Sequence, residues 1–155
     1  MKKLFVVAVA IAMIAMGGTA MAVDTATVTV SAIVAQTCRF SSPTAALAFG
    51  TLPSTAADVS ASTTLAFWCT TGASYTITDD DGLYEAGVNA NQMRSTALAT
   101  PQFMPYTLSY TPASGTGTGP SSPITMTLTG NILAASYASL PADVYQDTVT
   151  LTINP

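Results

Sequence analysis

The sequence predicts an all-β protein built as an antiparallel sandwich, and three observations lead to this fold class. Apolar residues alternate with threonine and serine in several short stretches, the period of a strand with one buried face. Glycine, proline and aspartate separate these stretches at short intervals. No convincing amphipathic helix follows residue 22. Short strands with such punctuation are typical of a two-sheet antiparallel sandwich.

The first 22 residues have the composition of a secretory signal peptide. Lys2 and Lys3 precede an apolar run over residues 4–16, and small residues lead to Ala22. The apolar run is shorter than the roughly 20 residues that a membrane-spanning helix needs. We therefore expect cleavage after Ala22, a mature chain of residues 23–155, and no retained membrane anchor.

Six stretches carry the strand pattern, and each places its apolar side chains on one face. β-Branched threonine occupies many of the alternate positions, where it suits an exposed pleated surface. The apolar positions are, in chain order, Val28, Val30, Ala32 and Val34; Leu65, Phe67 and Cys69; Tyr75 and Ile77; Tyr106, Leu108 and Tyr110; Ile124, Met126 and Leu128; and Val149, Leu151 and Ile153.

Turn-forming residues separate the predicted strands. Three aspartates and Gly82 follow the third stretch, and residues 112–123 are rich in glycine, serine, threonine and proline. Within the second of these turns, residues 115–119 superficially resemble a phosphate-binding glycine loop. No helix or lysine follows, as such a site requires, so a mobile loop is predicted instead.

The predicted mature chain is acidic and poor in catalytic groups. Arg39 and Arg94 stand against eight acids, a formal net charge of −6 with no lysine. Such a chain is a poor partner for nucleic acid or anionic lipid. It has no histidine, which excludes catalysis by a nucleophile with a histidine base. No catalytic residue, cofactor or metal is predicted, and the protein is not expected to be an enzyme.

Two cysteines, Cys38 and Cys69, are predicted to form a disulfide. An exported chain meets an oxidising compartment, where paired cysteines form disulfides by default. Without histidine, two cysteines are too few for a zinc site, and no CxxC pair suggests redox chemistry. In the chain-entropy model, closing this loop stabilises the fold by about 3–4 kcal/mol.

Two weaker signals have both a structural and a functional interpretation. Asp79, Asp80, Asp81 and Glu85 surround the Gly82 turn, and a solvated turn is favoured over a loose calcium site because the spacing is not that of an EF-hand loop. Trp68 has the opposite parity to Phe67, so it faces outward; partial cover by a loop is favoured over an open stacking surface.

The first and last predicted strands lie close to the two ends of the mature chain. Natural edge strands are usually protected by lysine, proline or bulges. Residues 144–153 contain no positive charge and no proline. An unprotected strand in so weakly charged a chain indicates a surface that pairs with another strand.

A set of short motifs occurs in a fixed order along the mature chain. They are the alternating segment before Cys38, Phe67-Trp68-Cys69, Ser74-Tyr75-Thr76-Ile77 before the Gly82 turn, Met93-Arg94, PYTLSY over residues 105–110 and YQDTVTLTI over residues 145–153. In these motifs the chain resembles the spore coat protein U domain, the pilin domain of archaic chaperone–usher fimbriae. The resemblance covers essentially the whole mature chain.

The resemblance implies an incomplete immunoglobulin-like antiparallel β-sandwich that a donor strand completes. Residues 23–36 would be the donor-strand segment and residues 37–155 the pilin-type domain. The side chains implied to fill a neighbour's groove are Val28, Val30, Ala32 and Val34, and those implied to form the final strand of the acceptor groove are Val149, Leu151 and Ile153. The implied partners are neighbouring pilin subunits, a periplasmic chaperone and an outer-membrane usher.

The function that follows is a structural subunit of a secreted surface fimbria, assembled by donor-strand exchange and supporting adhesion or biofilm formation. The implied location is the cell surface, reached through the periplasm. Two alternatives remain open: a spore or cell-surface coat protein that forms no pilus, and a surface carbohydrate-binding adhesin module that uses an exposed face or the 112–123 loop.

Overall fold

The structure is a computed structural model that describes residues 23–55 and 57–155, so the predicted signal peptide lies outside the described residues. No helix in this described part is long and apolar enough to cross a membrane. The strands are β1 (Cys38–Phe40), β2 (Val59–Cys69), β3 (Ser74–Asp79), β4 (Gln92–Ser95), β5 (Phe103–Pro105), β6 (Thr107–Thr111), β7 (Ser114–Thr116), β8 (Ile124–Ile132), β9 (Tyr145–Gln146) and β10 (Leu151–Asn154). A single helical turn, α1 (Ala134–Tyr137), buries no side chain.

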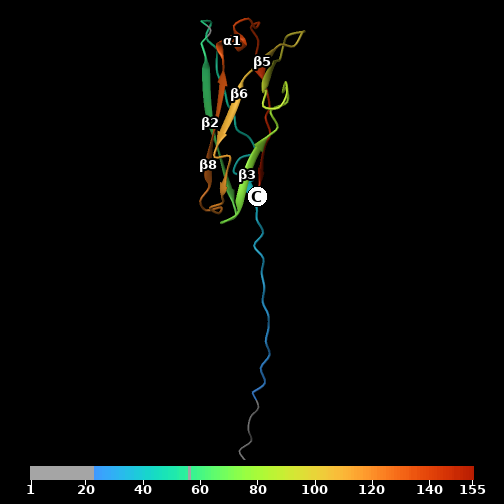
Figure 1. The fold of residues 1–155 in the computed structure, drawn as a ribbon, viewed down its shortest axis with the longest axis vertical. Helices are drawn as coiled ribbons and strands as arrows, with labels where there is room; N and C mark the ends of the chain where they lie inside the picture. The colour runs from blue at the N-terminus through green and yellow to red at the C-terminus, as the bar shows by residue number, and fades with distance from the viewer. Residues whose placement is uncertain (1–22, 56) are drawn as a thin grey trace, which may run out of the picture. The chain divides into compact units, whose positions relative to one another are not determined.

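Three antiparallel sheets make up the fold, which is all-β as the sequence predicts (Figure 1). The largest has the order β1-β2-β8-β6, and its two long strands pair from Val59 opposite Ile132 to Phe67 opposite Ile124. The other two have the orders β10-β3-β7 and β5-β4-β9. The last part of the chain therefore contributes an edge strand to each of the smaller sheets, first β9 and then β10.

The core lies between the large sheet and the β10-β3-β7 sheet. The inward side chains of β2, β3 and β8 alternate with exposed threonines and serines, as the sequence pattern predicts. Phe67 is fully buried and meets the ring of Tyr75 edge to face, with centroids 4.9 Å apart. The buried cluster is Leu65, Phe67, Cys69, Tyr75, Ile77, Met126 and Leu128.

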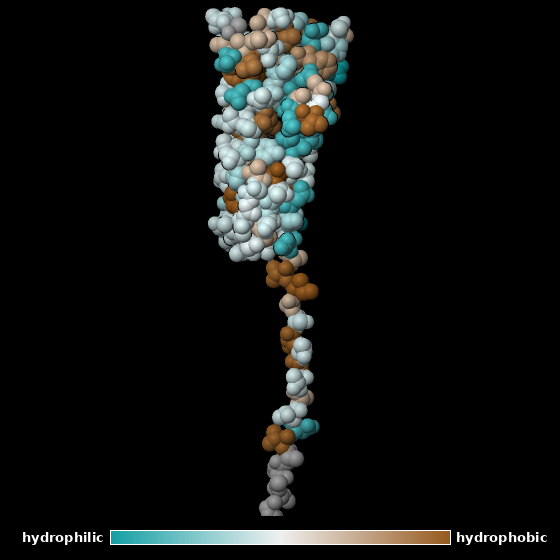
Figure 2. Space-filling model, in the orientation of Figure 1, coloured by the Kyte–Doolittle hydropathy of each residue, from teal (hydrophilic) through white to brown (hydrophobic). Residues whose placement is uncertain are grey.

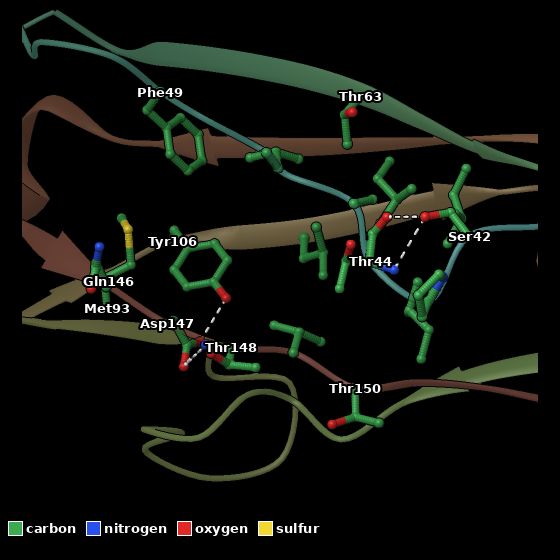
Figure 3. Close-up of a pocket in the computed structure, with 18 of the residues that line it drawn as sticks. Ser42, Thr44, Phe49, Thr63, Met93, Tyr106, Gln146, Asp147, Thr148 and Thr150 are labelled. Carbon is green, nitrogen blue, oxygen red and sulfur yellow. Dashed lines mark hydrogen bonds between the residues drawn. The ribbon is translucent and has the colours of Figure 1, made fainter.

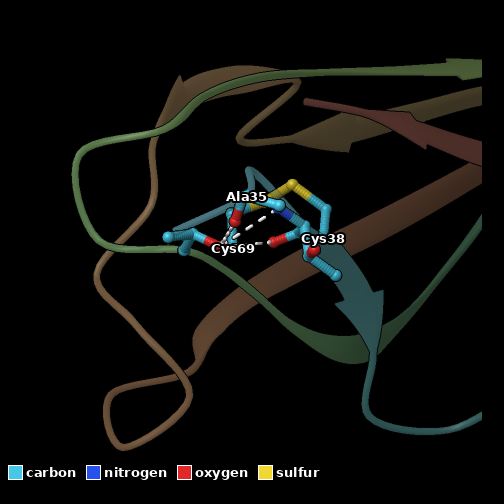
Figure 4. The surroundings of a disulfide bond; sticks show 5 residues. Ala35, Cys38 and Cys69 are labelled. Carbon is cyan, nitrogen blue, oxygen red and sulfur yellow. Dashed lines mark hydrogen bonds between the residues drawn. A yellow bond between two sulfur atoms is a disulfide. The ribbon is translucent and has the colours of Figure 1, made fainter. Parts of the chain in front are cut away.

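A disulfide joins β1 to the end of β2, which confirms the predicted pairing (Figure 4). Cys38 and Cys69 face each other across the two strands, with Cα atoms 4.0 Å apart. The Thr70 hydroxyl donates to the carbonyl of Ala35 and accepts from the N–H of Thr37, both at 3.1 Å. These contacts fasten the chain to this end of the sandwich just before β1 begins.

The glycine-rich stretch, predicted as a mobile loop, is instead held against the same end of the sandwich. Gly117 exchanges hydrogen bonds with Gly72 and Ala73, and the N–H of Gly119 donates to the carbonyl of Cys69 at 2.9 Å. Gly117 is buried, and a Cβ there would lie 2.7 Å from the Cβ of Cys69. Glycine is therefore needed here because the backbone packs directly on the disulfide.

Residues 34–155 form one compact unit, and residues 23–33 lie outside it. Residues 23–37 belong to no strand or helix. The valines of this segment are exposed: Val28 by 80%, Val30 by 89% and Val34 by 82%. Figure 2 shows apolar and polar residues alternating along the segment that precedes β1. The predicted strand pattern is thus present in the sequence, and the described residues include no strand that pairs with it.

Candidate functional site

A continuous groove runs along the edge of the sandwich between two segments that are far apart in sequence. One wall consists of residues 40–52 and the other of residues 140–151. The part nearer the disulfide has a volume of about 700 Å³, and the part nearer α1 about 660 Å³. Leu47, Phe49, Met93, Tyr145 and Gln146 line both parts, so we treat them as one feature, called the edge groove.

The floor of the edge groove consists of apolar side chains that are buried, and the partly buried apolar side chains lie in its walls. Leu65 and Leu128 from the large sheet line its disulfide end, and Met104 and Ile132 line its α1 end. Phe40, Leu47 and Leu151 pack against the buried cluster but remain only partly buried. Apolar side chains left in this state are what a sandwich shows where a covering strand is absent.

The wall over residues 143–153 has the side-chain alternation of a single strand, although it is assigned as strand only at β9 and β10. Its odd-numbered side chains are partly buried and its even-numbered ones are exposed. Residues of both kinds line the groove: the partly buried Asp147, Val149 and Leu151, and the exposed Gln146, Thr148 and Thr150. The alternation continues through the residues between β9 and β10, so the odd-numbered side chains of the whole segment are the more buried ones.

The even-numbered residues of this segment form main-chain hydrogen bonds with neighbouring segments of the same chain. The carbonyl of Val144 accepts from Thr96, the carbonyl of Thr148 accepts from Leu83, and the N–H of Thr150 donates to Asp80. In an extended chain, neighbouring residues direct their polar groups to opposite edges. The main-chain N–H and C=O of Asp147 and Val149 consequently point the other way, and they have no partner among the described residues.

A polar pair joins the floor of the groove to the wall over residues 143–153 (Figure 3). The Tyr106 hydroxyl donates to Oδ2 of Asp147 at 2.7 Å, and the ring of Phe49 meets the Tyr106 ring edge to face. Burial, together with the hydrogen bond to Asp147, raises the pKa of Tyr106 well above the ordinary range of a tyrosine. The hydroxyl is therefore protonated at neutral pH and acts as the donor.

Acid side chains hold the final segment in place by accepting main-chain N–H groups. Oδ1 of Asp147 accepts from Leu83 at 3.0 Å, and Oδ1 of Asp80 accepts from Thr150 at 2.8 Å and from Gly82 at 3.1 Å. The hydrogen bond from Thr150 is the main reason that the pKa of Asp80 is lowered. The acidic turn after β3 thus braces the groove wall between β9 and β10.

The opposite wall depends on a missing side chain in β8. A Cβ at Gly130 would lie 2.6 Å from Cζ of Phe49 and 2.9 Å from Cδ2 of Leu47. Any larger residue at position 130 would push these two side chains away from the sheet. Gly130 therefore sets how closely the first wall of the groove approaches the core.

The structure brings together only part of the predicted site. Val149 and Leu151 line the groove, and Ile153 packs against the core just beyond it. The predicted donor residues lie in the exposed segment or at its end. Sequence reasoning missed Leu47 and Phe49, whose alternation within an alanine-rich stretch was the available signal. It also missed the role of Tyr106, because its partner Asp147 is 41 residues away.

The two weaker signals have structural explanations in the described part of the chain. There, no group of three or more histidine, cysteine, aspartate or glutamate side chains is placed to hold a metal ion. The three aspartates form a turn in which Asp81 and Gly82 have positive φ angles of 58° and 94°. Trp68 is half-buried and pairs with Arg39 across β1 and β2, so it is not an open stacking surface.

Comparison with known proteins places the chain in a family. The family model of the Spore Coat Protein U domain matches residues 24–152, and the chain belongs to this family. None of the curated proteins compared with the chain matches it.

A solved structure shares the fold. It is the crystal structure of the CsuC–CsuE chaperone–tip adhesion subunit pre-assembly complex from the archaic chaperone–usher Csu pili of Acinetobacter baumannii. One of its chains superposes with a TM-score of 0.51 at 23% sequence identity. The match covers 77% of the present chain and 40% of that chain, less than half its length.

Proposed function

We propose that this protein is a structural subunit of a surface fimbria that is assembled by donor-strand exchange. One observation carries the proposal: in the groove wall over residues 143–153, main-chain groups without a partner among the described residues lie beside apolar side chains that are only partly buried. Such an edge binds an extended peptide as an additional strand, with main-chain hydrogen bonds giving affinity and alternate side chains filling pockets. The exposed segment 23–36 of another subunit has the alternation that this groove requires.

The free energy of binding favours a donor strand that has apolar side chains on one face and main-chain groups available for hydrogen bonds. Each small apolar side chain that is moved from water into the groove contributes on the order of 1–2 kcal/mol. Val28, Val30, Ala32 and Val34 would supply four such side chains from one face. Their free energy adds to that of a ladder formed with the unpaired groups of Asp147 and Val149, which makes the complex stable once formed.

The donor segment and the groove are different surfaces of the same chain. A contact between different surfaces propagates from copy to copy instead of closing as a symmetric dimer, so the product is an open fibre. Before assembly the uncovered groove would be a site for aggregation. We therefore propose that a periplasmic chaperone covers it and that an outer-membrane usher exchanges chaperone for donor strand, with the fibre supporting adhesion or biofilm formation.

The experiment that tests this function compares two forms of the protein on an unheated denaturing gel. Both are produced in a periplasm together with the chaperone, one as the mature chain and one without residues 23–36. We expect a ladder of polymers from the mature chain that collapses on heating, and no ladder from the shortened chain. The shortened chain still contains the disulfide and the groove, so it is a matched control for folding.

Two results would contradict the proposal. A folded monomer from both forms would show that the segment is not shared between copies. A ladder that persists without residues 23–36 would show that another surface drives assembly. In either case electron microscopy of the product would separate a coat layer from a fibre, since a coat protein forms sheets or patches in place of filaments.

A further inference from the structure

The direction in which a donor strand runs follows from where the chain leaves the sandwich. Residues 35–37 are fastened to Thr70, beside the disulfide. The α1 end of the groove lies at the opposite end of the sheet, because Ile132 lines it and pairs with the first residue of β2. The 11 residues of β2 place these two ends about 35 Å apart.

A fibre grows only if the disulfide end of one copy, where its donor segment leaves the sandwich, meets the α1 end of the groove in the next copy. If two copies instead met with their disulfide ends together, each could donate its strand to the other, and the pair would close as a dimer. A donor strand that enters the groove of the next copy at its α1 end has its own N-terminus toward the disulfide end of that copy. The donor is then antiparallel to the segment from Tyr145 to Ile153, the more stable arrangement for strand pairs.

Side-chain parity restricts the pairing further. The odd-numbered side chains of the final segment are the partly buried ones, and the four predicted plugs of the donor segment are all even-numbered, whereas its other large apolar residue, Ile33, has the opposite parity. Directly opposite residues in a sheet share a face. An antiparallel donor can therefore place any of the four plugs opposite Asp147, and the three registers that keep most plugs beside residues 145–151 set Val34, Ala32 or Val30 there.

The polar pair in the groove distinguishes these registers. A valine set against the Asp147 carboxylate would remove water from a charged group without replacing the lost hydrogen bonds. Alanine, the smallest of the four plugs, leaves space for Asp147 to keep its hydrogen bonds to Tyr106 and Leu83. The same register sets Val30 opposite Val149 and Val28 opposite Leu151, so that apolar side chains meet apolar side chains.

We propose that the occupant of the groove is the segment 28–34 of a second copy of this chain, antiparallel to the final segment, with Ala32 opposite Asp147. This inference rests on the proposed function, which already names the donor segment of another subunit, and it adds the register in which that segment pairs. The chain is then self-complementary and polymerises without a second type of subunit.

Paired cysteines test the register in the mature chain produced with its chaperone. The variant Val30→Cys with Val149→Cys places the two thiols directly opposite each other, about 5.5 Å apart at Cα, within disulfide range. Two matched variants combine Val149→Cys with Ala32→Cys or with Val28→Cys and so report the two neighbouring registers. We expect covalent ladders on a heated, non-reducing gel from the first variant, at least tenfold above both others.

Each alternative result overturns the register and leaves the proposed function distinguishable. Stronger cross-linking in either matched variant, or polymers on an unheated gel with none of the three cross-links, shows that the register is wrong while donor-strand assembly holds. If the unsubstituted mature chain gives only monomers, one copy of this chain does not donate its strand to the groove of another copy.

A second pair of variants covers the case in which a cysteine variant fails to fold. Ala32→Leu is expected to lower the polymerised fraction at least tenfold, because the larger side chain meets Asp147. Ser31→Leu, on the opposite face, is expected to leave the fraction unchanged. Equal effects of the two substitutions would overturn the proposal.

Discussion

At the scale of single residues, the edge groove depends on polar side chains as much as on apolar ones. Asp147 accepts from the Tyr106 hydroxyl and from the N–H of Leu83, so it ties the floor, the acidic turn and the groove wall together. The chain has few charged groups, 8% of its residues, and one of them, Asp147, lines the edge groove between apolar and polar side chains. Such a group is kept in place by the hydrogen bonds that it satisfies.

Removing the Tyr106 hydroxyl tests this tie. Tyr106→Phe deletes the donor to a charged acceptor, and hydrogen bonds to charged groups contribute about 1.5–3 kcal/mol. We expect the free energy of unfolding, measured by denaturant titration of the mature chain, to fall by about that amount. The matched control is Tyr84→Phe, because the described contacts of Tyr84 with Phe103 and Arg94 are made by its ring, which phenylalanine keeps. Equal losses in both variants would contradict the assigned role.

The lowered pKa of Asp80 predicts a specific acid sensitivity. A carboxyl whose pKa is lower in the folded state contributes stability above its unfolded pKa of about 3.9, and that contribution disappears as the pH falls through the folded value. We expect unfolding curves between pH 7 and pH 2 to show a smaller acid-induced loss for Asp80→Asn than for the unsubstituted chain. Asp81→Asn is the control, because its carboxylate accepts no hydrogen bond from the described residues and asparagine tolerates its positive φ.

At the scale of elements, the long strands agree with the sequence pattern and the final one agrees only in part. β2 and β8 follow the predicted alternation because the apolar side chains of each strand face the core and most of the alternate ones face away from it. The final segment keeps its alternation from residue 143 to residue 153 but pairs with two different sheets. Between β9 and β10 it is bound by Leu83 and by the side chain of Asp80, a contact across 70 residues that periodicity does not encode.

The glycine-rich element shows how a local composition can mislead. Its sequence suggests mobility, yet the absence of side chains allows the backbone to pack on the disulfide and on Ala73. Gly117→Ala is expected to lower the free energy of unfolding by about 1–3 kcal/mol, because the added methyl group has no space. Thr116→Ala, at an exposed position in β7, is the matched control. A neutral result for Gly117→Ala would show that the stretch is as mobile as its composition suggests.

At the scale of the whole molecule, one side chain in the segment before β1 is expected to decide whether copies assemble. Val30→Asp would place a carboxylate in the groove opposite Val149, at a cost of about 3 kcal/mol or more because the charge has no partner there. We expect the ladder on an unheated gel to disappear, while the variant still folds and co-purifies with its chaperone.

The control for this prediction uses the alternate face of the same segment. Thr29→Asp adds the same charge one residue earlier, where the side chain would point to solvent, so assembly is expected to continue. Normal fibres from Val30→Asp would show that Val30 is not a donor residue. Loss of fibres from both variants would indicate that added charge, and not the face of the strand, prevents assembly.

The sequence by itself determined the all-β class, the exposed or buried parity of the long strands, the disulfide and the family resemblance. These properties are local or compositional: alternation with a period of two, turn residues at short intervals, and two cysteines in an exported chain. Only the tertiary structure decided where the groove lies, because Leu47, Phe49, Tyr106 and Asp147 approach one another only after the sheets have packed. It also decided which main-chain groups have no partner among the described residues. These groups lie at an edge of the sandwich, where no neighbouring strand of the described chain pairs with them.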